Sequence, residues 1–111
     1  MNQATFSPPQ NWLPDIIEVI VTQFAPQQII LFGSAARGET NPNSDLDLLI
    51  VFEKIENKRQ TAIEIRRALR NIPVSKDILV TTPAEIAEYR HTHGLILRPA
   101  LREGKVIYAR A

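Results

Sequence analysis

The chain has 111 residues, enough for one domain with a single hydrophobic core. It contains no cysteine, so disulfides, zinc–thiolate sites and thiol catalysis are excluded. Thirteen basic and twelve acidic residues give a net charge of +1, which argues against strong general binding to nucleic acid. No apolar stretch approaches the length of a membrane span, and the N-terminus lacks the features of a signal peptide. We therefore expect a single cytoplasmic domain over residues 1–111.

A first helix is predicted from apolar residues at helical spacing near the N-terminus. Asn11 is the candidate N-cap, and Pro26 ends the pattern. The apolar stripe comprises Leu13, Ile16, Ile17, Ile20 and Phe24. Residues 28–32 then read as a short buried strand.

A glycine-serine turn follows this strand. Gly33 lets the backbone turn and approach a ligand closely. Ser34 is expected to cap a short helix over residues 35–38, and free N–H groups at a helix N-terminus bind phosphate readily. Arg37 is a candidate partner for a phosphate oxygen or an acid, although an arginine on a short helix is more commonly just exposed to solvent. The sequence thus predicts a phosphate-binding turn.

Two aspartates lie at the start of a second apolar run, Leu46 to Phe52, which reads as a strand buried on both faces. Alternate residues of a strand share a face, so Asp45 and Asp47 should project side by side. Asp45 alone could be explained as a residue that caps or turns the chain after residues 41–44, but Asp47 lies inside the apolar run. Ionising two neighbouring carboxylates there costs several kcal/mol unless a cation holds them.

A divalent metal would supply that cation. Hard oxygen ligands suit magnesium or manganese, which proteins usually hold with one or two carboxylates plus substrate phosphates. Carboxylates, a metal and a phosphate-binding turn together describe a site for a nucleoside triphosphate.

The rest of the chain predicts helices and two more strands. The predicted elements are a helix over residues 57–71 with the buried stripe Ala62, Ile65, Leu69 and Ile72, a strand over 74–82, a helix that starts with the capping box Thr82-Pro83-Ala84-Glu85, a late helix over 95–102, and a closing strand over 105–108. We expect an α/β or α+β fold with about three sheet strands covered by helices.

The arginines of the predicted helix over 57–71 and the two histidines are explained by exposure to solvent, without a binding role. Arg59, Arg66 and Arg70 recur at helical spacing, and without aromatic residues between them a solvated face is the commoner explanation. His91 and His93 would diverge on a helix, which favours roles facing solvent. Nucleic-acid binding is therefore not indicated.

Gly33-Ser34, followed after ten residues by Asp45-Leu46-Asp47, matches the signature of the polymerase-beta-type nucleotidyltransferase superfamily. The longer strings Gly33-Ser34-Ala35-Ala36-Arg37-Gly38 and Ser44-Asp45-Leu46-Asp47-Leu48 resemble its smallest branch, the minimal nucleotidyltransferases. The motif constrains about eight positions in type and spacing, so it is far more specific than a lone glycine-rich loop.

This resemblance implies a polymerase-beta-like core with a mixed sheet and a metal site at one edge. It further implies that Asp45 and Asp47 bind the metal that grips the triphosphate, and that Asp77 is a third ligand or the general base. Asp77 lies near the middle of the predicted third strand, although an edge strand would carry it to solvent, paired with Lys76. The residues expected at the nucleotide are Gly33, Ser34, Arg37 and Ser44.

The reaction implied is transfer of AMP from ATP to a hydroxyl with release of pyrophosphate. Two magnesium ions, or manganese, about 4 Å apart would stabilise the attacking and leaving oxygens.

Minimal nucleotidyltransferases that resemble this chain are commonly the antitoxin half of a toxin–antitoxin pair, and the toxin is a HEPN-type RNase. The resemblance therefore implies a hetero-oligomer in which this chain AMPylates a toxin tyrosine. Two alternatives stay open: an antitoxin that acts by occlusion alone, and an enzyme acting on a small-molecule hydroxyl. Only about thirty residues follow the third predicted strand, which favours an acceptor brought by another protein.

Overall fold

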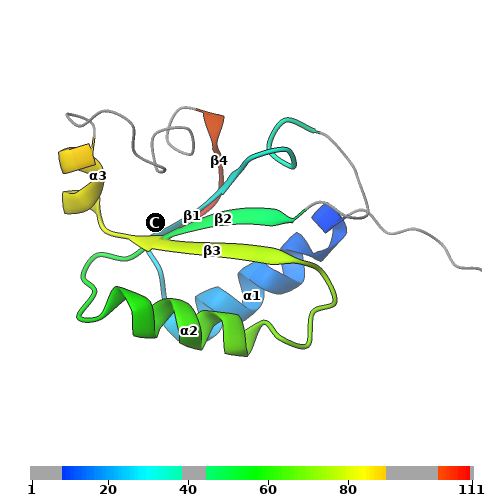
Figure 1. Ribbon diagram of the computed structural model, residues 1–111, viewed down its shortest axis with the longest axis horizontal. Helices are drawn as coiled ribbons and strands as arrows, with labels where there is room; N and C mark the ends of the chain where they lie inside the picture. The colour runs from blue at the N-terminus through cyan, green and yellow to red at the C-terminus, as the bar shows by residue number, and fades with distance from the viewer. Residues whose placement is uncertain (1–8, 39–44, 90–102, 111) are drawn as a thin grey trace, which may run out of the picture.

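The computed structural model describes residues 9–38, 45–89 and 103–110. Four strands form one mixed sheet in the order β3-β2-β1-β4 (Figure 1). The elements are a 3₁₀ turn η1 (Pro9–Trp12), α1 (Leu13–Phe24), β1 (Gln28–Phe32), β2 (Leu46–Val51), α2 (Lys58–Ala68), β3 (Lys76–Thr81), α3 (Pro83–Tyr89) and β4 (Lys105–Ala109). The expected α/β core is confirmed, but the sheet has four strands rather than about three.

The sheet combines both kinds of strand pairing. β1 pairs antiparallel with β2 and with β4, whereas β2 and β3 run parallel and are connected through α2. β4 pairs with β1 across an irregularity between Ile29 and Ile30. The hydrophobic pattern predicted this last strand but not its neighbour, because β1 and β4 lie far apart in the sequence.

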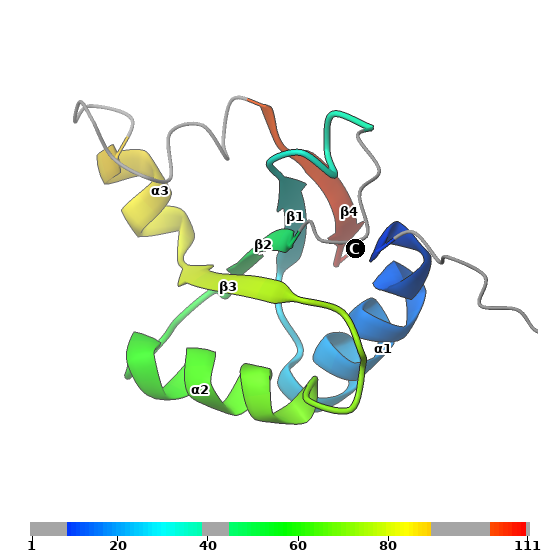
Figure 2. The ribbon, with the colours of Figure 1, turned by 45° about the vertical axis from the view of Figure 1, so that its right-hand side comes forward.

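The main core fills the space between the sheet and the two longer helices. α1 and α2 lie side by side against one face of the sheet (Figures 1 and 2). The buried residues of this layer include Ile16, Ile20 and Ile65 from the helices, Leu69 directly after α2, and Leu46, Leu48, Ile50, Ile78 and Val80 from the strands. Each such side chain stabilises the fold by about 1.5–3 kcal/mol relative to an exposed position.

The opposite face of the sheet carries a smaller apolar cluster. Its buried members Ile30, Leu49 and Val51 pack with Phe32, Leu79 and Ile86. Because Ile86 belongs to α3, this short helix covers part of that face. Asp47 precedes Leu49 by two residues, so it projects from the same face, away from α1 and α2.

The ends of α1 correct one expectation. The 3₁₀ turn η1 contains Asn11, and Trp12 occupies the N-cap position without a side-chain cap bond, so the prediction of Asn11 as N-cap is wrong. The helix ends before Pro26, as expected. Ala25 adopts a left-handed backbone (φ 49°) and donates its N–H to the carbonyl of Val21 at 3.2 Å.

α2 begins and packs as expected. The Asn57 side chain accepts the backbone N–H of Gln60 at 3.0 Å and so caps the first turn. The predicted stripe is confirmed: Ile65 and Leu69 are fully buried, and Ala62 and Ile72 pack against the core. The helix ends at Ala68, earlier than predicted, because Leu69 leaves the helical conformation.

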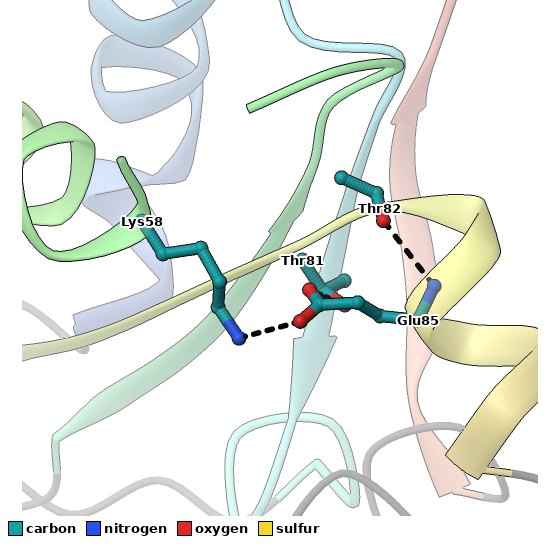
Figure 3. Close-up of polar contacts among 4 residues, drawn as sticks. All are labelled: Lys58, Thr81, Thr82 and Glu85. Atoms are coloured by element: carbon teal, nitrogen blue, oxygen red, sulfur yellow. Dashed lines mark hydrogen bonds and ion pairs between the residues drawn. The ribbon is translucent and has the colours of Figure 1, made fainter. Parts of the chain in front are cut away.

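A polar network ties the end of β3 to both α2 and α3 (Figure 3). Thr81 is fully buried and donates its hydroxyl to Glu85 Oε1 at 3.1 Å. Glu85 Oε2 accepts from Lys58 Nζ at 2.9 Å. The Glu85 backbone N–H donates to Thr82 Oγ1 at 3.2 Å, which is one half of the predicted capping box. The Glu85 carboxylate is bonded by Thr81 and Lys58, so it joins three elements.

Several predictions fall outside the described residues, namely the helix over 95–102, His91, His93 and Ser44. In the parts of the chain that the structure describes, no helix has both the length and the apolarity needed to cross a bilayer.

Replacing Thr81 with valine should lower the free energy of unfolding by about 1–2 kcal/mol. The substitution keeps the side-chain volume but deprives Glu85 of a buried hydrogen-bond donor. Urea unfolding measures the change. The control Thr22→Val lies at an exposed position of α1 and should stay within about 0.5 kcal/mol of the wild type. Equal stability of the two variants would show that the Thr81 bond contributes nothing.

Candidate active site

The candidate site lies where β1 ends and β2 begins. Because these strands are antiparallel, Phe32 at the end of β1 pairs with Asp47, the second residue of β2. The chain therefore leaves β1 through Gly33 directly beside the Asp47 carboxylate. The glycine-serine turn and the aspartates, ten residues apart in the sequence, meet in the fold.

Two independent constraints require glycine at position 33. Its φ is +76°, in the left-handed region that other residues rarely adopt. A Cβ placed there would overlap Asp47 Oδ2 and lie 3.2 Å from Asp47 Cγ. The expected turn is present, and the group that closely approaches Gly33 is the carboxylate of Asp47.

Residues 34–38 form consecutive turns rather than the expected short helix. The three N–H donors Ala36, Arg37 and Gly38 bond the carbonyls of Gly33, Ser34 and Ala35, each at 3.1 Å. The segment is too short to nucleate an α-helix, and Gly38 leaves it with a φ of +82°. Within the part of the chain that the structure describes, the backbone N–H groups of Ser34 and Ala35 donate no hydrogen bond. These two groups are the donors that a phosphate would use.

The three predicted acids come together at one end of the sheet. Asp47 and Asp77 are register partners on the parallel strands β2 and β3, so their side chains share a face. Asp45 directly precedes β2 and follows the same alternation. Asp77 is the second residue of β3 rather than near its middle, because the strand begins at Lys76 instead of Val74.

The electrostatics of Asp47 reflect the neighbouring carboxylates. Partial burial raises the pKa of Asp47 above its usual range, and the negative charges of Asp77 and Asp45 raise it further. Ionisation of Asp47 is therefore less favourable here than in water.

The chemistry of the donor set fits a divalent cation, which would relieve the repulsion among hard carboxylate oxygens. Among the residues that the structure describes, however, no three acidic or histidine side chains converge in a metal-binding geometry. The residues that would hold magnesium or manganese are Asp45 and Asp47, with Asp77 beside them.

The other predicted residues have different surroundings. Arg37 is exposed, and its Nη1 lies 3.6 Å from Glu103 Oε1, so it has the acidic partner considered from the sequence. Lys76 turns away from Asp77: its Nζ donates to the carbonyls of Ile72 at 2.8 Å and Val74 at 2.7 Å. The pairing of Lys76 with Asp77 is therefore wrong, whereas the edge position and exposure of Asp77 are confirmed.

Sequence reasoning missed two contacts near the site. Glu103 pairs with Arg37, and Arg66 Nη2 donates to the carbonyl of Ile78, the residue after Asp77, at 3.2 Å. No signal in the sequence pointed to Glu103. The basic face that contains Arg66 was visible, but the pattern could not show that one arginine reaches β3.

Comparison with known proteins shows the family and the fold of this chain. Residues 14–111 match the family model of polymerase beta, nucleotidyltransferase. One relative, the protein adenylyltransferase MntA of Aphanizomenon flos-aquae (strain 2012/KM1/D3), is 32% identical over 89 residues, which are 74% of this chain and 56% of the relative. The chain thus spans about half the length of that relative.

Solved structures share the fold. A putative nucleotidyltransferase from Sulfolobus solfataricus superposes with a TM-score of 0.63 at 22% identity, over 90% of this chain and 79% of the other. A chain from the complex of a tri-AMPylated Shewanella oneidensis HEPN toxin with its MNT antitoxin gives a TM-score of 0.54 at 18% identity, over 92% and 73% of the two chains. Since the family model covers α1 through β4 and the fold agrees, the chain belongs to the polymerase beta nucleotidyltransferase family.

Proposed function

We propose that this protein transfers AMP from ATP to a hydroxyl group of a partner protein in a metal-dependent reaction. The observation that carries the proposal is the position of Asp47. Its carboxylate lies against Gly33 at the phosphate-binding turn, and its pKa is raised partly by the charges of Asp77 and Asp45. Ionising Asp47 beside two other acids lowers the stability of the fold, and carboxylates placed in this way are typical of functional sites.

Each part of the site has a role in this reaction. The backbone N–H groups of Ser34 and Ala35 would bind triphosphate oxygens, and Arg37 would exchange Glu103 for a phosphate. Asp45 and Asp47 would hold magnesium, which when bound neutralises charge on the phosphates. The acceptor oxygen forms a bond to the α-phosphorus, the bond to the β-phosphate oxygen breaks, and pyrophosphate leaves. Asp77 would take the proton of the acceptor hydroxyl or bind a second ion.

The proposed acceptor is a tyrosine of a HEPN-type toxin, and the proposed assembly is a hetero-oligomer of the two proteins. The MntA relative and the structure of an AMPylated HEPN toxin with its antitoxin support this choice. We further propose one cytoplasmic domain over residues 1–111, with Ser44 also at the nucleotide.

ATP should bind tightly only with magnesium or manganese. Without a cation, Asp45 and Asp47 repel the triphosphate, so EDTA should weaken ATP binding at least about tenfold. Isothermal titration measures the affinity. The double variant Asp45→Asn, Asp47→Asn serves as the control, since its affinity should no longer respond to magnesium. Equal ATP affinity of the wild type with and without EDTA would remove the metal from the proposal.

Asp47→Asn should be more stable than the wild type at neutral pH, by about 0.5–1 kcal/mol for a partly exposed group. The pKa of Asp47 is higher in the folded than in the unfolded protein, so the folded state binds more protons than the unfolded state in the pH range between 3.8 and the raised pKa. The wild type therefore loses stability as the pH rises from 3.8 through the raised pKa, whereas the variant does not. Urea unfolding across pH 3–8 tests this. A variant less stable than the wild type at pH 7 would contradict the electrostatic account.

Transfer itself should depend on both acids. Asp45→Asn together with Asp47→Asn should keep the fold and lower the transfer of label from α-labelled ATP to the HEPN-type partner at least about a thousandfold, because the charge that holds the metal is lost. Asp15→Asn, a matched change at an exposed position of α1, should transfer normally.

Protection against the toxin distinguishes the remaining alternatives. Full neutralisation by the double variant, with no AMP on the partner by mass spectrometry, would establish occlusion as the mechanism. Transfer to a small-molecule hydroxyl but not to the partner would reassign the acceptor.

A further inference from the structure

Asp77 lies on an edge strand of the sheet. Within the part of the chain that the structure describes, the ladder of hydrogen bonds of β3 extends to β2 alone. The carbonyls of Ser75 and Thr81 accept the N–H groups of Leu46 and Phe52 at 2.9 Å, which shows that odd-numbered carbonyls of this segment face β2. By the alternation of a strand, the carbonyl of Ile78 faces outward.

Side chains fasten both chain neighbours of Asp77 from outside the ladder. Arg66 Nη2, from the last turn of α2, donates to the outward carbonyl of Ile78 at 3.2 Å. Lys76 Nζ donates to the carbonyls of Ile72 and Val74, in the turn that connects α2 to β3. The residues before and after Asp77 are thus both attached to α2 or to the turn that follows it.

These attachments leave the site face free. α2 packs on the face of the sheet opposite the acidic residues, and its contacts with β3 belong to the main core. Among the described residues, Arg66 and Lys76 bond the β3 backbone or the preceding turn and form no ion pair with an aspartate. Any effect of theirs on the site must pass through the strand.

We propose that Arg66 and Lys76 are positioning residues that fix the Asp77 carboxylate relative to Asp47. The inference rests on the proposed function, in which Asp77 serves the acceptor hydroxyl. Asp47 lies on an inner strand and is fixed by ladders on both sides, whereas Asp77 depends on one ladder and these two cations. Reaction rates respond steeply to such placement, because a shift of about 1 Å can cost roughly a hundredfold.

Arg66→Met tests the proposal, since it keeps the aliphatic stem and loses the donor. The turnover number for AMP transfer to the HEPN-type partner should fall about tenfold or more, while the KM for ATP changes less than about twofold, because Asp45, Asp47 and the turn at Gly33 still bind the nucleotide. Lys76→Met should act in the same direction. Arg66→Lys, which keeps a long cationic donor, should recover part of the lost rate.

Arg67→Met is the matched control. Arg67 is exposed on the same helix, and its side chain makes no hydrogen bond or ion pair with any residue that the structure describes. Its loss removes the same charge and should leave the turnover number unchanged. An equal fall in Arg66→Met and Arg67→Met would overturn the proposal in favour of a general charge effect.

A double-mutant cycle separates positioning from a structural role. In the Asp77→Asn background, Arg66→Met should have no further effect on turnover, because the group that it positions is gone. Additive losses would overturn the proposal.

Hydrogen exchange keeps the inference separate from the proposed function. Amides of β3 should exchange faster in Arg66→Met than in Arg67→Met, with or without ATP. If the wild type transfers no AMP, the proposed function fails. The hydrogen-exchange rates of the β3 amides then remain as the test of whether Arg66 fixes this strand. Equal exchange in the two variants would then overturn the proposal.

Discussion

The contact between Gly33 and Asp47 is the constraint on which the site depends. The pairing of Phe32 with Asp47 brings the end of β1 beside the carboxylate, and only a residue without a Cβ, in a left-handed conformation, fits there. The same conformation turns the chain away from the sheet and directs the N–H groups of Ser34 and Ala35 out of the ladder. A larger side chain at position 33 would displace the acid and redirect the turn together, so the turn proposed to bind phosphate and the acid proposed to hold the metal cannot be changed independently.

The two faces of the sheet have different roles: one carries the main hydrophobic core, and the other carries the acidic residues. The helices α1 and α2 cover most of one face, and that core supplies the apolar burial on which folding depends. The opposite face has a smaller apolar cluster, so it can carry a carboxylate whose ionisation is unfavourable. The raised pKa of Asp47 means that its ionisation destabilises the folded state, and solvent screening at this partly exposed position keeps that cost small beside the 5–15 kcal/mol typical of a domain. The main core offsets that cost without contacting the acid.

The sequence predicted those features that local pattern determines. Strand 28–32 and the helical stripe around Ile65 follow from periodicity, and Asp47 stands out because a charge interrupts an apolar strand. Features that depend on tertiary neighbours could not be read in this way. The edge position of Asp77 depends on the strand order, and the bond from Arg66 to Ile78 depends on how α2 crosses that edge. Turns instead of a helix after Gly33 reflect a segment too short for helical hydrogen bonds to offset the cost of nucleation.

The different settings of Asp47 and Asp77 imply an order of access in the proposed reaction. Asp47 is partly buried on an inner strand under Gly33, where a nucleotide bound at the turn would cover it. Asp77 is exposed on the edge strand, so a hydroxyl carried by another protein can approach it from outside the sheet. An edge strand open to a partner is also easily displaced, because it lacks a second ladder. In the proposed arrangement, Arg66 and Lys76 hold β3 from the side of α2. The backbone around Asp77 is thereby fixed, while the opposite face, by which an acceptor would enter, stays open.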